Sequence, residues 1–191
     1  EAVAAAQNSK LGNGGSAHRH AGGAGRWVDH GHHALMRMAA YKAVHGYDES
    51  FTHNEDAELD VRLRRAGYRI WLTGATMLDY VPRATPGALF RQYRAYGRGR
   101  LRTLQKHRLM PKLRQLLPVV VAPAAVLALG APLLPIAALP FAMWAALCLG
   151  YGAALAYRAR RAPLLLSGPA AMLIHGGWSL GFWQELLRRH A

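Results

Sequence analysis

The fold of this chain is decided by one stretch, HNEDAELDVRLRRAG, which occupies residues 53–67. The stretch holds four carboxylates in a protein of 191 residues whose formal net charge is +14. After Asp79 no acidic residue follows until Glu185, so this acidic segment stands alone in a strongly basic chain. The segment is therefore the first place to look for chemistry.

The stretch predicts a helix that begins within a residue or two of Asn54 and ends at Gly67. Thr52 and Glu55 fit a capping box, and Asn54 is an alternative N-cap. A glycine just after the last turn is a common helix stop. One face of the helix is expected to be buried, with apolar residues at i, i+4 and i+7: Leu59, Leu63 and Ala66.

The four carboxylates differ in their position along this helix. Two are expected to form i,i+4 pairs on an exposed surface, each stabilising the helix by about 0.2–0.5 kcal/mol: Glu58 with Arg62 and Asp60 with Arg64. Glu55 and Asp56 lie in the first turn, where the helix dipole favours the ionised form by about 0.3–1 kcal/mol each. An ionised carboxylate there can take a proton from a hydroxyl nucleophile, or it can simply cap the helix. The residues alone leave both interpretations open.

Histidines follow a short strand predicted at Trp27-Val28-Asp29. The run His30-Gly31-His32-His33 raises the question of a metal site. Zinc sites need three or four ligands that converge from separate elements, and neighbours on an extended chain point to opposite faces. We therefore favour a polar loop near a substrate pocket, and we assign no metal ligand in this chain.

Local signals predict the other elements of the first 114 residues. The segment Gly12–Gly25 is interpreted as a loop rather than a phosphate cradle, because it has neither the Walker nor the dinucleotide-binding spacing. We expect a short helix over 1–10, strands at Ala34–Met38, Tyr68–Thr73 and Thr76–Tyr80, a helix over Ala39–His45 closed by Gly46, and a helix from Thr85-Pro86 to about Tyr96.

Basic residues dominate the segment from Arg83 to Arg114, which contains ten Lys or Arg and no Asp or Glu. Three functions compete for these charges: nucleic-acid binding, attraction to anionic lipid, and stabilisation of a diphosphate leaving group. An apolar segment begins directly after Arg114. We therefore favour the membrane surface for most of these residues and expect no nucleic-acid partner.

Residues 115–157 carry no charged side chain, which is enough for two membrane-spanning helices of about 20 residues each. We expect a helical hairpin, Leu116–Leu134 and Ile136–Tyr157, with a break at Pro132–Pro135. Arginines follow the second helix, so the positive-inside rule places both ends of the hairpin in the cytoplasm. A third apolar segment, 163–187, is weaker, and we favour a span over an interfacial helix.

Composition divides the chain into a mixed, basic part, 1–114, and a mostly apolar part, 115–191, within a hydrophobic content of 52%. The single Cys148 lies in an apolar run and supplies neither a disulfide framework nor a metal cluster. Because the chain starts Glu1-Ala2-Val3, without an initiator Met or a signal peptide, we expect an internal fragment of a longer protein.

The order of motifs around the acidic helix resembles family-2 glycosyltransferases. The motifs concerned are Gly46-Tyr47-Asp48-Glu49, Glu55-Asp56-Ala57-Glu58-Leu59, Arg62, Gly67 and Tyr68–Leu72. Within this family the chain resembles the membrane-anchored ExoA-type enzymes of succinoglycan biosynthesis. Their Val-Asp loop and Gln-Tyr-x-x-Tyr-Gly segment are similar to Val28-Asp29 and to residues 92–97. The resemblance covers roughly residues 1–110 and continues into a similar hydrophobic tail.

This resemblance implies an α/β fold, with the C-terminal part of a glycosyltransferase A domain in 1–114 and an α-helical transmembrane region in 115–191. The Asp of the Glu-Asp pair is the family's general base, here Asp56. The family's Asp-x-Asp motif, which helps to bind a divalent metal (Mg or Mn) and the donor diphosphate, has no counterpart in this chain and is expected upstream. The implied or expected substrate-binding candidates are Asp29, His30, Glu55, Gln92, Arg94, Tyr96 and Arg100, with Glu55 more structural than catalytic.

The implied function is inverting transfer of a sugar from a nucleotide-sugar donor to a lipid-linked or growing polysaccharide acceptor. The expected location is a bacterial inner membrane, with the catalytic part in the cytoplasm. The fragment is expected to be inactive alone, because it lacks the nucleotide-binding half. The alternative is a non-enzymatic membrane subunit whose basic segment binds anionic lipid or polymer.

Overall fold

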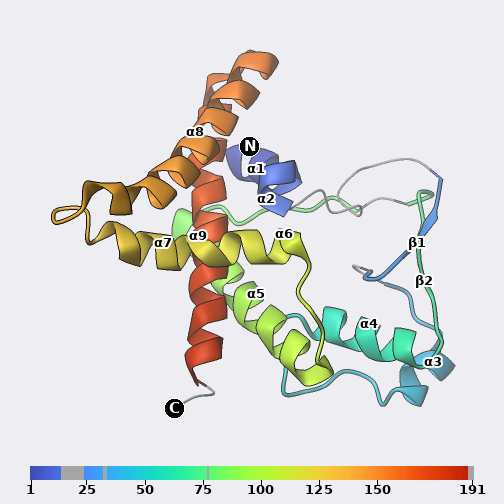
Figure 1. The fold of residues 1–191 in the computed structure, drawn as a ribbon. Helices are drawn as coiled ribbons and strands as arrows, with labels where there is room; N and C mark the ends of the chain where they lie inside the picture. The colour runs from blue at the N-terminus through green and yellow to red at the C-terminus, as the bar shows by residue number, and fades with distance from the viewer. Residues whose placement is uncertain (14–23, 32–33, 77, 189–191) are drawn as a thin grey trace. The chain divides into compact units, whose positions relative to one another are not determined.

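The part of the chain that the computed structural model describes is mostly helical and covers residues 1–13, 24–31, 34–76 and 78–188 (Figure 1). It divides into two compact units. Unit 1 consists of Glu1–Gly15, Val81–Arg98 and Met110–Ala191, and unit 2 consists of Ser16–Tyr80 and Gly99–Leu109. The predicted division after residue 114 concerns the membrane boundary and stays a prediction.

Helix α5 (Pro86–His107) contributes its first part to unit 1 and its last part to unit 2. The other elements of unit 2 are β1 (Arg26–Val28), α3 (Met38–Ala43), α4 (Glu55–Arg65) and β2 (Ile70–Leu72). Those of unit 1 are α1 (Ala2–Asn8), α2 (Lys10–Asn13), α6 (Leu113–Leu116), η2 (Leu117–Val120), α7 (Val121–Ala128), η3 (Pro135–Ala138), α8 (Leu139–Ala159), η4 (Ala162–Leu166) and α9 (Ser167–Arg188).

The sheet found in the described residues has two antiparallel strands, β1 and β2. Its register places Trp27 opposite Trp71, and the two rings meet edge to face with centroids 4.8 Å apart. The Arg69 guanidinium lies 3.7 Å from the centre of the Trp27 ring, which is a cation–π contact. An aromatic pair and one cation therefore stabilise a very short sheet.

Several predicted elements are confirmed. They are the first helix (α1), the strands β1 and β2, the helix α3 with Gly46 at a positive φ of 67°, and the Thr85 cap of α5, whose hydroxyl accepts the Ala88 N–H at 3.2 Å. The Gly-rich residues 14–23, the pair His32-His33 and Met77 lie outside the described part of the chain.

Two predicted strands are wrong. Residues 34–37 are irregular and lead into α3, which already includes Met38, so they have no partner strand in the described sheet. The described residues of the segment 76–80 are also irregular. Helix α5 runs on to His107 instead of ending near Tyr96. Gly97 does not stop the helix. It lies where the backbone of α5 touches the backbone of the helix that contains Trp178.

Helix α4 begins at Glu55 and ends before Gly67, as predicted. Its N-cap is Asn54, which has a left-handed backbone (φ 61°) and makes no side-chain cap hydrogen bond. An ordinary N-cap has an extended backbone, from which its side chain reaches the first turn. The predicted Thr52–Glu55 capping box is therefore wrong, because the chain enters this helix through a left-handed residue instead.

The apolar side of α4 packs on α3. Leu59 and Leu63 form a buried cluster with Ala40 and Val44, as their spacing predicts. The third residue of the predicted face, Ala66, is exposed. It lies after the last helical residue, Arg65, where the chain turns away towards β2.

Glu58 and Asp60 are buried, with 0% and 3% exposure, so their predicted place on an exposed surface is wrong. Residues two positions apart point to nearly opposite sides of a helix, and unit 2 covers both of these sides. The predicted pair Glu58–Arg62 forms, with 2.7 Å between Oε2 and Nη2. Arg64 instead pairs with Asp29 at 3.5 Å.

The Glu58 carboxylate holds the last turn of α5 against α4. Its Oε1 accepts hydrogen bonds from Lys106 Nζ at 2.6 Å and from His107 Nε2 at 2.8 Å, and Arg62 donates to both carboxylate oxygens. Burial raises the pKa of Glu58, but the hydrogen bonds from these basic side chains outweigh burial and lower that pKa to about 2. Lys106 also reaches Asp48 Oδ2 at 2.6 Å, which fixes the loop before α4.

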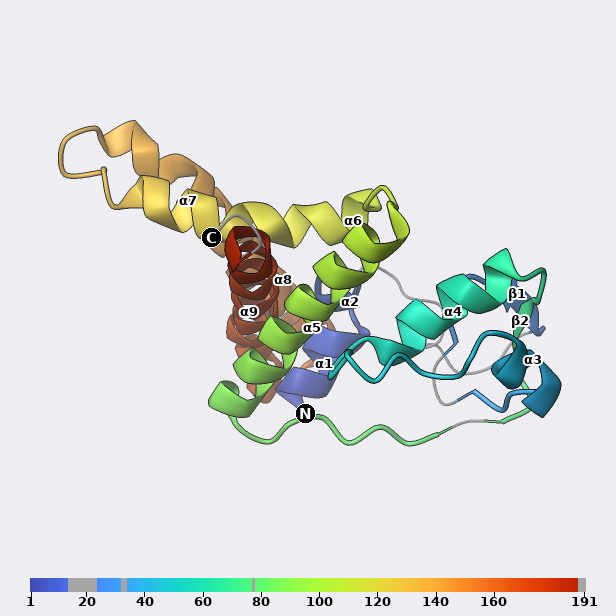
Figure 2. The same ribbon diagram turned by 90° about the horizontal axis from the view of Figure 1, so that it is seen from below.

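Unit 1 is built around α9, against which α1, α7 and α8 lie (Figures 1 and 2). The first part of α5 crosses α9 with backbone touching backbone. A Cβ on Gly177 would lie 2.6 Å from the Phe90 carbonyl oxygen, and a Cβ on Gly181 would collide with that of Arg94. Gly97 of α5 faces the Trp178 carbonyl in the same way. Only glycine permits this contact.

Within the described residues, Pro135–Ala159 is the one helical stretch long and apolar enough to cross a membrane, and 17% of its most apolar window is buried. A helix is therefore present where the second arm of the hairpin was predicted, and its crossing of a membrane stays a prediction. The predicted length of the first arm is wrong, because α6, η2 and α7 form one continuous helical stretch, Leu113–Ala128, that ends well before Leu134. The third segment forms η4 and α9, and its placement at a membrane stays a prediction.

Replacing Glu58 by Gln should destabilise the protein by about 3 kcal/mol, because three basic groups then lose their buried counter-charge. We take the lower end of the usual range since Arg62 and Lys106 remain partly exposed to solvent. Chemical denaturation of the purified protein in detergent measures this loss. Glu49→Gln is the matched control, because Glu49 is exposed.

The difference between wild type and Glu58→Gln should depend on pH in a defined direction. The pKa of Glu58 is lowered from 4.5 to about 2 on folding, so ionisation stabilises the folded state fully above pH 4.5. This stabilisation disappears as the pH falls through about 2. An advantage of wild type that stays constant across this range would show that the carboxylate charge contributes nothing.

Replacing Gly181 by Ala should push α9 away from α5 and destabilise unit 1 by about 1–3 kcal/mol, because the added methyl group meets the backbone of the other helix. Gly150→Ala is the control, since a Cβ on Gly150 meets no atom within 4 Å and alanine favours a helix. Thermal unfolding in detergent compares the two variants. Equal stabilities would contradict the proposed backbone contact.

Candidate active site

Asp56 and Asp60 are one turn apart on α4 and therefore point to the same side of the helix. The loop that follows β1 lies on this side. Asp60 Oδ2 accepts the backbone N–H of Gly31 at 2.9 Å and is 2.6 Å from His30 Nδ1. The buried Asp60 therefore anchors the loop and orients the imidazole.

The other imidazole nitrogen faces Asp56. His30 Nε2 is 3.8 Å from Asp56 Oδ2, and the two side chains are 26% and 34% exposed. Asp56 Oδ1 accepts the backbone N–H of Ala57 at 2.7 Å. Asp56 therefore accepts a backbone N–H at one oxygen, faces a histidine with the other, and is partly exposed to solvent.

Tyr47 belongs to the same surroundings. Partial burial raises the pKa of its phenol, and the negative charge of Asp56 raises it further, with smaller contributions from Tyr41, Glu55 and Asp60. The Tyr47 ring meets that of Tyr41 edge to face, with centroids 5.7 Å apart. Tyr47 thus places an aromatic ring and a hydroxyl near the carboxylates of the first turn of α4.

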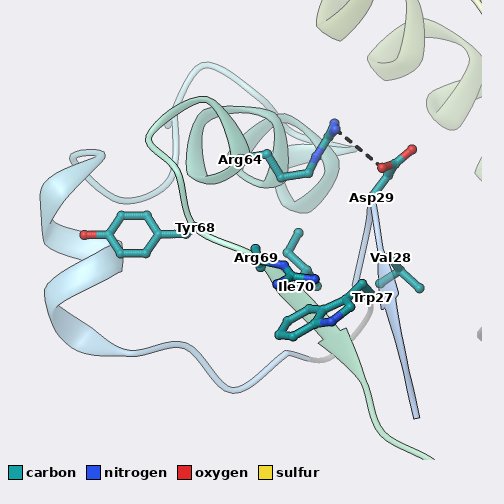
Figure 3. A pocket seen from close by; sticks show the side chains of 7 residues that line it. All are labelled: Trp27, Val28, Asp29, Arg64, Tyr68, Arg69 and Ile70. Carbon is teal, nitrogen blue, oxygen red and sulfur yellow. Dashed lines mark ion pairs between the residues drawn. The ribbon is translucent and has the colours of Figure 1, made fainter. Parts of the chain in front are cut away.

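Asp29 lies beside this group, in a shallow pocket of about 220 Å³ that is drawn in Figure 3. Its carboxylate pairs with Arg64 across the pocket, and both side chains reach solvent. The Trp27 ring and the Arg69 side chain lie next to each other at the opposite side of the view. The pocket therefore offers an acidic, a basic and an aromatic group to a polar ligand.

Arg100 approaches the start of α4 from α5. Its Nη2 lies 3.4 Å from Asn54 Oδ1. A Cβ on the neighbouring Gly99 would collide with the His53 carbonyl oxygen, so the two segments meet at the backbone. Glu55 is half-buried and is the first residue of α4, which is its predicted place at the helix start.

The other predicted site residues lie in unit 1. Gln92 donates from Nε2 to the Tyr96 hydroxyl at 3.0 Å, and Arg94 donates from Nε to Gln184 Oε1 at 2.7 Å. Unit 2 thus brings together Asp29, His30, Glu55, Asp56 and Arg100, whereas Gln92, Arg94 and Tyr96 form contacts along α5 and with α9. The substrate-binding roles of all these residues stay predictions.

The spacing of residues did not indicate three of the important side chains. Asp60 and Glu58 have partners that are 30 and 49 residues away in the sequence, so no local pattern indicates their burial. Tyr47 stands inside a recognised motif, but only the fold places it near Asp56. The charge composition of the chain was the one signal that could have indicated this burial. Buried acidic residues need basic partners, and the chain offers His30, Lys106 and His107.

The described residues do not fit a metal ion as they stand, since they contain no group of three or more His, Cys, Asp or Glu side chains that could hold one. His30 and its two carboxylates are joined to one another by hydrogen bonding and charge.

The comparisons with known proteins assign the chain to a class. Residues 15–157 match the model of the glycosyl transferase family group 2, and the chain belongs to this family. It is 58% identical over 187 residues to the succinoglycan biosynthesis protein ExoA of Rhizobium meliloti (strain 1021). That match covers 98% of this chain and 56% of the relative, so the chain spans little more than half of the relative's length. No solved structure matches the chain.

Replacing Asp60 by Ala should release the loop at His30-Gly31, because the Gly31 N–H loses its buried acceptor. We expect the Gly31 amide to exchange with solvent at least about tenfold faster, which corresponds to about 1.4 kcal/mol. Hydrogen exchange measured by NMR or mass spectrometry tests this. Asp29→Ala removes the exposed ion pair with Arg64 and should leave the exchange nearly unchanged.

Proposed function

We propose that the full-length protein transfers a sugar from a nucleotide-sugar donor to a lipid-linked or growing polysaccharide acceptor, with inversion at the anomeric carbon. Asp56 is the general base that takes the proton of the acceptor hydroxyl. Membership of the family and the similarity to a succinoglycan biosynthesis protein support the reaction class. The observation that carries the residue assignment is the geometry of Asp56, a half-exposed carboxylate in the first turn of α4.

The proposed chemistry needs one base and one stabilised leaving group. The acceptor oxygen attacks the anomeric carbon of the donor, and its proton passes to the Asp56 carboxylate. The bond from the anomeric carbon to the diphosphate oxygen breaks, and the nucleoside diphosphate leaves with the bonding electrons. General base catalysis of this kind typically contributes about 10²–10⁴-fold to a rate.

The proposed architecture is a glycosyltransferase A domain whose sheet draws strands from residues outside this chain. The open two-stranded sheet of unit 2 is compatible with such an extension. A divalent metal, Mg or Mn, would be bound mainly by residues outside the chain, and it would neutralise charge on the donor diphosphate. The candidate contacts to the donor or acceptor remain Asp29, His30, Gln92, Arg94, Tyr96 and Arg100.

The proposed location is a bacterial inner membrane, with the catalytic part in the cytoplasm, where nucleotide sugars are made. Two observations support a membrane. The stretch Pro135–Ala159 has the length and composition of a span. Large apolar side chains on and next to it are exposed, for example Leu133, Met143 and Leu147. Lipid would remove this apolar surface from water.

Replacing Asp56 by Asn in the full-length protein should lower sugar transfer at least about 10²-fold, because the amide cannot take the acceptor proton. Binding of the donor nucleotide and the unfolding temperature should stay close to wild type. Asp79→Asn is the matched control, since Asp79 is an exposed carboxylate of unit 2. Transfer at the wild-type rate by Asp56→Asn would overturn the base assignment.

A further inference from the structure

His30 lies between two carboxylates of α4, and each of its ring nitrogens faces one of them. We infer that His30 is a second proton acceptor in the transfer reaction. It receives the acceptor proton from Asp56 and is oriented for this step by Asp60. This inference rests on the proposed function, because it assigns a role behind the base Asp56.

The contacts of Asp60 determine which imidazole nitrogen carries a proton. Asp60 Oδ2 accepts the Gly31 N–H and is 2.6 Å from His30 Nδ1. An ionised carboxylate can only accept, so Nδ1 must be the donor in this contact. In the neutral imidazole the other nitrogen, Nε2, then carries the lone pair that can accept a proton. This nitrogen faces Asp56 Oδ2 at 3.8 Å.

The proposed step conserves protons and electrons. The acceptor hydroxyl gives its proton to the Asp56 carboxylate while its oxygen bonds to the donor sugar. The protonated Asp56 then passes the proton to His30 Nε2, and the resulting imidazolium lies between two carboxylates. Asp56 is thereby ionised again while the product is still bound, and solvent later removes the proton from His30.

The distance between Asp56 and His30 must shorten slightly before a proton can pass between them. Nε2 and Oδ2 are 3.8 Å apart. Proton transfer needs about 2.6–3.2 Å or one bridging water, and such contacts are commonly longer without substrate. Both side chains are partly exposed, so a change in one side-chain torsion or one water closes the gap. Nδ1 is already at hydrogen-bond distance from its partner.

A purely structural role for His30 would leave part of this geometry unexplained. The loop is already anchored by the Gly31 N–H, which shares Asp60 Oδ2. The imidazole adds a second donor to the same oxygen and directs its remaining nitrogen to the proposed base. A side chain needed only as an anchor could be replaced by asparagine, whose amide N–H also donates to Asp60. This difference makes the proposal testable.

Among the described residues, the charged and titratable groups around His30 come from α4, from the segment after α3 and from the end of β1. Helix α4 supplies Asp56 and Asp60, and the segment after α3 supplies Tyr47, whose pKa is raised by burial and by these carboxylates. The neighbouring Asp29 is paired with Arg64. His30 thus has one carboxylate at each ring nitrogen, Asp60 at 2.6 Å and Asp56 at 3.8 Å.

The test compares His30→Asn with His45→Asn in the full-length protein, with sugar transfer measured across pH. His45 is an exposed histidine of unit 2 with a left-handed backbone that asparagine tolerates, so it is a matched control. For His30→Asn we expect kcat to fall at least about tenfold at neutral pH, with the donor KM and the unfolding temperature near wild type. His45→Asn should behave as wild type.

The pH profile separates a proton acceptor from an anchor. The low-pH limb of kcat should lie at a lower pH in His30→Asn than in wild type, because an imidazole is a stronger base than a carboxylate. Added imidazole should restore part of the activity of His30→Ala but not that of Asp56→Asn. A wild-type kcat and an unchanged low-pH limb in His30→Asn would overturn the inference.

The two proposals fail in different ways. If Asp56→Asn is inactive and His30→Asn is fully active, Asp56 remains the base and His30 is only an anchor, which rejects the inference alone. If Asp56→Asn is as active as wild type, the base assignment itself fails and the inference fails with it. If His30→Asn does not fold, rescue of His30→Ala by imidazole decides, since only a proton acceptor is replaced by free imidazole.

Discussion

The position of helix α4 depends on the buried Glu58 carboxylate. With no exposed surface of its own, it binds Arg62 on the same helix and Lys106 and His107 at the end of α5. A buried charge without partners costs several kcal/mol. The end of α5 can therefore cover the Glu58 side of α4 only if these contacts form together. They also hold the pKa of Glu58 at about 2, which keeps the charge in place at any physiological pH.

Because Glu58 fixes the orientation of α4, helical geometry also fixes where Asp56 and Asp60 point. Because Glu58 points towards α5, the residues two positions before and after it, Asp56 and Asp60, point to the other side. There Asp60 is buried under the loop of His30 and Gly31, while Asp56 remains half-exposed. One carboxylate thus fixes the helix, a second fixes the loop, and the third is left to meet a substrate. Three roles follow from a spacing of two residues.

Much of unit 2 follows from local sequence signals. The limits of α4, the strands β1 and β2 and the cap of α5 could be predicted, because Gly67, Thr85-Pro86 and short apolar runs act on their immediate neighbours. The burial of Glu58 and Asp60 could not, since their partners are 30 to 49 residues away and an acidic residue beside an arginine equally fits a solvated surface. The assignment of Asp56 came from the order of motifs, and the structure adds its neighbours, His30 and Tyr47. The early end of the first arm at Ala128 could not be predicted, because apolar composition continues past the last helical residue.

The central claim is that Asp56 takes the proton of the acceptor hydroxyl. The most direct measurement is a structure of the full-length protein with a nucleoside diphosphate and an acceptor oligosaccharide bound. Our account predicts one acceptor hydroxyl within about 2.6–3.2 Å of an Asp56 carboxylate oxygen, with His30 Nε2 on the far side of that carboxylate. An acceptor hydroxyl that lies at hydrogen-bond distance from a different carboxylate, with Asp56 remote from the sugar, would contradict it.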